Sequence, residues 1–93
     1  MDHIKADPAK LAVRLRGLRK ERGTSLEKLS RQLALEYGLE RSRQNLHQHE
    51  TGIRIPSSQA VAGYCRIYNL NTADARELFE LAGYVVVFAT EEA

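Results

Sequence analysis

A run of polar side chains between Ser42 and Gly52 has the clearest capacity for specific chemistry. Ser42 is a good helix N-cap and Gly52 suits the left-handed position that follows a helix, so the pattern predicts one short helix between them. Gln and Asn side chains match the paired hydrogen-bonding groups of adenine in the DNA major groove, and Arg matches those of guanine. The polar side chains of the run that could contact bases are Arg43, Gln44, Asn45, His47 and Gln48.

A solvated surface helix is the alternative interpretation of the same run. Surface helices usually carry Lys and Glu, whereas this one carries amides, histidines and a single Arg. Only Leu46 is a clear apolar anchor, and His49 shares its face at the i+3 position. A helix this polar buries little surface of its own, so other elements must hold it in place.

Length and composition predict one small domain. The chain has 93 residues, 43% of them hydrophobic, and no apolar run approaches the roughly 20 residues needed to span a bilayer. Its first ten residues lack the apolar stretch of a signal peptide. The single cysteine, Cys65, cannot form an internal disulfide and is interpreted as a small core residue. We therefore expect a cytoplasmic protein without membrane association.

Charge is distributed unevenly along the chain. Residues 1–54 contain 12 Lys/Arg and 7 Asp/Glu, a net charge of +5, whereas residues 55–93 contain 2 and 5, a net charge of −3. A basic half beside an acidic half favours a polyanionic partner on one side of the molecule. Many of the cations, Arg14 and Arg16 among them, are also compatible with an ordinary solvated helix face.

Capping residues place the other helices around the polar one. Five helices are predicted to begin after Asp7, Ser25, Ser42, Ser57 and Asn71 and to end before Gly23, Gly38, Gly52, Asn69 and Gly83. Leucines recur at helical spacing within the first two, at Leu11, Leu15 and Leu18 and at Leu26, Leu29 and Leu33. The expected fold class is therefore all-α.

The C-terminal segment has a different character. Residues 84–88 are β-branched and aromatic, which predicts a short strand. A lone strand leaves its backbone groups unpaired, so we expect a second copy of the chain to supply the partner strand through Val85, Val86, Val87 and Phe88. The alternative is an extended segment packed over the helices. The expected division is a helical domain at residues 1–84 and a strand with its tail at 85–93.

Five segments in order carry a resemblance to a known family. They are residues 18–23 (LRKERG), 25–30 (SLEKLS), 42–52 (SRQNLHQHETG), 54–57 (RIPS) and 78–84 (LFELAGY). Together they make the chain similar to the lambda-repressor-like helix-turn-helix family, also known as the Cro/CI or XRE type. The resemblance implies a five-helix DNA-binding domain whose third helix lies in the major groove.

The resemblance also assigns roles to individual residues. Base contacts fall on Arg43, Gln44, His47 and Gln48, with Asn45 at the edge of that face. Phosphate contacts fall on Ser25, Ser42, Thr51 and Arg54 and on the backbone amides from Thr51 to Arg54. A structural ion pair between Arg19 and Glu50 is implied, holding the third helix against the first.

Three features depart from the family pattern. The stretch from Leu33 to Ser42 is about six residues longer than usual, which would lengthen the second helix and the following turn. Leu26 stands where members often have Gln, so any DNA contact there is left to the backbone. His49 replaces a large apolar residue and is interpreted as a core histidine with one hydrogen-bond partner.

These observations favour a sequence-specific transcriptional regulator, most simply a repressor, which binds double-stranded DNA as a homodimer on a two-fold symmetric operator. The alternative is an antitoxin or anti-regulator that uses the C-terminal strand to bind another protein. No enzyme, cofactor or metal site is expected, since the sequence has no phosphate loop and no ligand cluster, and His47 and His49 project from opposite sides of a helix.

Overall fold

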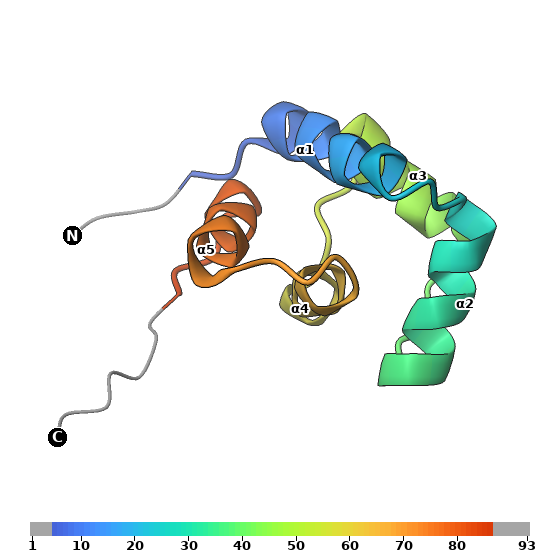
Figure 1. The fold of residues 1–93 in the computed structure, drawn as a ribbon. Coiled ribbons are helices and arrows are strands. Elements are labelled where there is room, and N and C mark those ends of the chain that lie inside the picture. Colours follow the sequence, from blue (N-terminus) through green and yellow to red (C-terminus); the bar gives the residue numbers. More distant parts are fainter. Residues whose placement is uncertain (1–4, 87–93) are drawn as a thin grey trace, which may run out of the picture.

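The computed structural model describes residues 5–86, which form five helices and no strand (Figure 1). The helices are α1 (Pro8–Glu21), α2 (Leu26–Tyr37), α3 (Arg43–Thr51), α4 (Ser58–Ile67) and α5 (Thr72–Leu81). The prediction of a five-helix, all-α fold is confirmed. Each helix begins at its predicted N-cap, whose side chain accepts a hydrogen bond from the backbone N–H three residues later.

All five helices contribute to one apolar core. In Figure 1, α1 runs along the top of the molecule, with α5 and α4 below it and α2 at the far end beyond α3. The core side chains are Leu11, Leu15, Leu18, Leu29, Leu33, Leu46, Val61, Tyr64, Tyr68, Leu78 and Ala82. α3 contributes only Leu46 to this set, so the core must be completed by its neighbours and α3 must be held by other interactions.

The connection between α2 and α3 is fixed at several points. The Leu39 N–H donates to the Leu33 carbonyl at 3.0 Å, which closes the C-terminal turn of α2. The Ser30 hydroxyl donates to the Arg41 carbonyl at 2.6 Å, and Arg41 Nη2 donates to Ser57 Oγ at 3.2 Å. These contacts tie the connection to α2 on one side and to the start of α4 on the other.

Gly63 lets α4 approach this connection closely. A Cβ atom built on Gly63 would lie 2.8 Å from Leu39 Cδ1 and 2.9 Å from Leu33 Cδ2. Both distances are too short for real carbon atoms, so a side chain at this position would displace the two leucines. The glycine therefore lets Leu39 cover the end of the core between α2 and α4.

The described part of the C-terminal segment differs from its predicted strand. Tyr84 is anchored to the bundle, because its hydroxyl donates to the Pro56 carbonyl at 2.9 Å and its ring packs edge-on against Phe79. Tyr84, Val85 and Val86 are not in a strand, and Val85 is 66% exposed. Residues 5–86 of one chain provide no neighbouring strand with which this segment could pair. Val87 and Phe88 lie outside the described residues, so pairing between two copies stays a prediction.

Candidate nucleic-acid interface

The two sides of α3 have different surroundings. Leu46, His49 and Glu50 point into the bundle and are buried. Arg43, Gln44 and His47 are exposed, and Gln48 is half-buried. Because an α-helix has 3.6 residues per turn, these four outward positions share one face. The predicted base-contacting face is therefore open along its length, apart from the partial burial of Gln48.

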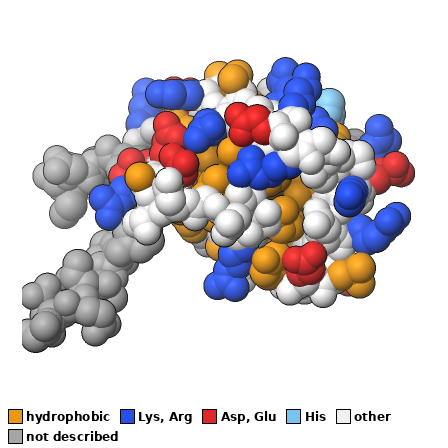
Figure 2. Space-filling view, viewed as in Figure 1, with side chains coloured by type: hydrophobic (Ala, Val, Ile, Leu, Met, Phe, Trp, Pro, Cys, Tyr) orange, Lys and Arg blue, Asp and Glu red, His pale blue; other side chains and the backbone are white. Residues whose placement is uncertain are grey.

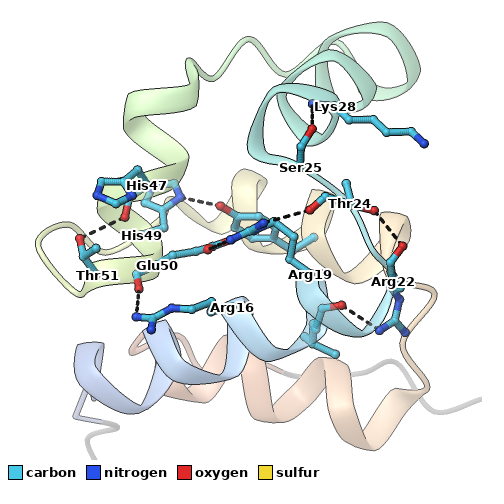
Figure 3. A network of polar contacts seen from close by, with 12 residues as sticks. Arg16, Arg19, Arg22, Thr24, Ser25, Lys28, His47, His49, Glu50 and Thr51 are labelled. Atoms are coloured by element: carbon cyan, nitrogen blue, oxygen red, sulfur yellow. Dashed lines mark hydrogen bonds and ion pairs between the residues drawn. The ribbon is translucent and has the colours of Figure 1, made fainter.

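An ion pair joins the inner side of α3 to α1 (Figure 3). Arg19 Nε donates to Glu50 Oε2 at 2.8 Å and Arg19 Nη2 donates to Glu50 Oε1 at 2.9 Å, so the contact is bidentate. Arg19 Nη1 also donates to the Thr24 carbonyl at 3.0 Å. The hydrogen bond from Arg19 to Glu50 raises the pKa of the guanidinium despite its partial burial. Glu50 is only 3% exposed, so the guanidinium supplies the charge that this buried carboxylate requires.

Two further contacts bind the C-terminal end of α3 to α1. Arg16 Nη2 donates to the Glu50 carbonyl at 2.9 Å, which satisfies an acceptor near the helix end (Figure 3). Gly52 ends the helix at φ +80°, a conformation that side chains rarely adopt, and lies against the backbone of Pro8. Arg16 is exposed, as expected for a solvated face, but its guanidinium also binds α3. Arg14 is paired as well, with Glu77 at 3.2 Å.

His49 links α3 to α4. Its Nδ1 lies 2.8 Å from the Tyr64 hydroxyl, and the side chain is 4% exposed. Burial, followed by the charges of Arg41 and Arg54, lowers the pKa of His49 to about 4, and the nearby Glu50 carboxylate only partly opposes this. The imidazole is therefore neutral at pH 7, as expected for a core histidine with one polar partner.

The hydroxyl groups expected to hold phosphate are partly engaged within the protein. Ser42 Oγ donates to Asn45 Oδ1 at 2.7 Å, and Thr51 Oγ1 donates to the His47 carbonyl at 3.0 Å. A hydroxyl has one proton, so neither can donate to a phosphate while these bonds remain. Asn45 likewise uses its carbonyl oxygen on Ser42. Ser25 Oγ accepts from the Lys28 N–H and keeps its own proton available.

The backbone amides at the end of α3, which were predicted to hold phosphate, also donate within the protein. The N–H groups of Gly52, Ile53 and Arg54 all donate to the Gln48 carbonyl, those of Ile53 and Arg54 at 3.0 and 3.3 Å. This convergence follows from the tight left-handed turn, which places successive amides over the last turn of the helix. The guanidinium of Arg54 is exposed in this loop, and its contact with phosphate stays a prediction.

Leu26 and α3 enclose a hollow at the start of the polar face. It is lined by Leu26, Ser42, Arg43, Gln44 and His47. The sequence places Leu26 in the apolar stripe of α2 and gives it no hydrogen bond to DNA, but it does not predict that Leu26 lines a hollow with α3. Arg41 was also missed, although it joins the α2–α3 connection to Ser57. Arg41 does not stand out by type or spacing, because it lies in an ordinary position beside a helix cap.

Replacing Glu50 by Gln should destabilise the fold by about 3 kcal/mol, because the Arg19 guanidinium would lose its buried counter-charge. Urea denaturation followed by circular dichroism measures this change. Glu77→Gln is the matched control, since it breaks a pair whose side chains are 33% and 43% exposed and should cost less than about 1 kcal/mol. Equal losses in the two variants would contradict the role assigned to the Arg19–Glu50 pair.

His49 should make stability rise with pH between about 4 and 6.5. Its folded pKa is lowered to about 4, so the unfolded chain takes up the proton first as the pH falls. We expect wild type to lose about 2 kcal/mol more than His49→Phe between pH 7 and pH 5.

Urea denaturation at the two pH values tests this expectation, with His47→Phe as a control that removes an exposed histidine from the same helix. An unchanged stability difference between wild type and His49→Phe at pH 7 and pH 5 would show that His49 is not held neutral by the fold.

Two properties of the described residues bear on other functions. Among residues 5–86, no three His, Cys, Asp or Glu side chains lie close enough together to hold a metal ion. No helix in that same range has the length and apolar character required to cross a membrane.

Comparison with known proteins identifies the family. A search of curated proteins found no match, and a search of solved structures found none. A family model described as a helix-turn-helix domain matches residues 10–79, which extend from α1 through most of α5. The chain therefore belongs to the helix-turn-helix domain family, in agreement with the lambda-repressor-like resemblance of its sequence.

Proposed function

We propose that this chain is a sequence-specific DNA-binding transcriptional regulator that inserts residues 43–50 of α3 into the major groove of its operator. The observation that carries the proposal is the division of α3 into an anchored side and an open one. Glu50 is held by Arg19, whereas Arg43, Gln44 and His47 project from the surface. A helix fixed in this way can present its side chains without first becoming ordered, which lowers the entropic cost of binding.

Each outward side chain has a matching group on a base edge. Arg43 suits the two acceptors of guanine, and Gln44 and Gln48 suit the donor and acceptor of adenine. His47 is exposed between them and can hydrogen-bond from either ring nitrogen. Asn45 belongs at the margin of the contact, because its carbonyl oxygen already accepts from Ser42.

Cations and free backbone N–H groups around α3 suit contact with the phosphate backbone. Arg54 is exposed just beyond α3, and Ser25 caps the N-terminus of α2, where the first backbone N–H groups favour an anion. Figure 2 shows Lys and Arg side chains projecting from the edge of the molecule over α1 and α2. In this proposal Ser42 and Thr51 contribute less than Arg54, since their hydroxyl protons are engaged within the protein.

We further propose that the protein acts as a homodimer on a two-fold symmetric operator and represses by occupying it. The β-branched and aromatic run at Val85, Val86, Val87 and Phe88 is the proposed contact between copies, and the exposure of Val85 supports it. The same run also suits a different protein chain, as in an antitoxin or anti-regulator. Light scattering separates the two, because a homodimer forms from the pure protein and the other complex needs its partner.

Gln44→Ala and Arg54→Ala should weaken DNA binding in different ways. The duplex is the sequence enriched from a random pool, and binding is followed by fluorescence anisotropy at several salt concentrations. Loss of Gln44 removes one base contact, so discrimination at one base position should fall by about 1–3 kcal/mol. Loss of Arg54 removes a phosphate contact, so all sequences should be bound more weakly and the salt dependence should become less steep.

Arg76→Ala, in the acidic C-terminal half, is the matched control for removal of a positive charge. If Gln44→Ala and Arg54→Ala changed binding in the same sequence-independent way, the assigned division between base and phosphate contacts would be wrong. If no sequence were enriched from the pool, the proposal of sequence-specific binding would fail.

A further inference from the structure

The hollow beside α3 combines one apolar side chain with a polar rim. It has a volume of about 520 Å³ and is open to solvent between the start of α2 and α3. Leu26 is the first residue of α2 and is only half-buried, so part of its side chain remains on the surface. The other lining residues are Ser42, Arg43, Gln44 and His47. The hollow therefore lies within the face proposed to meet DNA.

A leucine at this place restricts what can occupy the hollow. Its side chain cannot donate a hydrogen bond to a phosphate or to a base. Among the groups that the major groove presents on base edges, the C5-methyl of thymine is the apolar one. An apolar surface flanked by hydrogen-bonding side chains therefore fits a thymine edge better than it fits any other base.

We propose that Leu26 is a specificity-determining residue that contacts the C5-methyl group of a thymine in the operator. This inference rests on the proposed function and adds a residue outside α3 to the base-reading set. An A·T pair presents adenine's hydrogen-bonding groups and thymine's methyl side by side in the major groove. Gln44 and Leu26 line the same hollow, so the amide reads adenine while the leucine contacts thymine in the same or the adjacent base pair.

Leu26 is positioned well enough to discriminate between bases. Its helix begins at Ser25, whose side chain accepts from the Lys28 N–H at 3.1 Å, and its inner atoms pack against the apolar core. The facing start of α3 is fixed in the same way, by the bond from Asn45 N–H to Ser42 Oγ. Both walls of the hollow are thus set before DNA arrives.

Deoxyuridine tests this proposal directly, because it differs from thymidine only by the missing methyl group. Each thymine of the selected operator is replaced in turn, and binding is measured by fluorescence anisotropy. In wild type, one position in each half-site should lose about fourfold in affinity, the effect expected for burial of one methyl group. Leu26→Ala should abolish the difference between thymidine and deoxyuridine at that position, whereas Leu26→Met, which stays apolar, should keep it.

Leu35→Ala is the matched control, because Leu35 lies on the same helix, is 78% exposed and does not line the hollow. Circular dichroism establishes that each variant is folded. If every deoxyuridine substitution affected wild type and folded Leu26→Ala equally, the proposal would be overturned while the proposed function stood. If the pool gave no enriched sequence, both would fall together.

Discussion

The bidentate pair between Arg19 and Glu50 is the interaction on which the arrangement of this protein depends. A helix with one core leucine cannot be held by apolar burial alone, because Leu46 contributes only about 2–3 kcal/mol. A buried carboxylate would by itself be costly, and the fork of Arg19 meets both of its oxygens. The pair therefore fixes how α3 is rotated about its axis, and that rotation decides which side chains face outward.

Other polar contacts hold α3 from different directions. Arg16 binds its C-terminal carbonyl from α1, and His49 meets Tyr64 on α4. At His49, where the family resemblance places a large apolar residue, a polar contact holds the helix instead. The outer face is in this way left to Arg43, Gln44 and His47, whose hydrogen-bonding groups remain open to solvent.

The helices could be predicted from the sequence because their signals are local. Each N-cap bonds three residues ahead, so Ser25 or Ser42 can be recognised without knowledge of the fold. The partnership of Arg19 with Glu50 was implied only by the family resemblance, since it joins residues that are distant in sequence. Spacing alone could not have revealed that Arg16 reaches a carbonyl on α3 or that Leu26 shares a hollow with Gln44. These relations depend on how the helices pack.

The sequence could not show how a group with two potential partners is used. The backbone amides of Ile53 and Arg54 were predicted to donate to a DNA phosphate. The turn after α3 directs them to the Gln48 carbonyl within the protein. The hydroxyl of Thr51 is likewise taken by a carbonyl of its own helix. A β-branched run at the C-terminus predicted a strand, yet Val85 and Val86 are not in one, because strand formation needs a neighbour that sequence composition cannot identify.

The most direct test of the central claim is a nuclear magnetic resonance titration of the protein with its selected operator duplex. Amide and side-chain shifts should change most at residues 43–48, at the start of α2 and at Arg54, while the Arg19 guanidinium signal keeps its hydrogen-bonded position throughout. Changes concentrated on α4 and α5, or loss of the Arg19 signal on binding, would contradict the account of α3 as an anchored helix that reads DNA with its outer face.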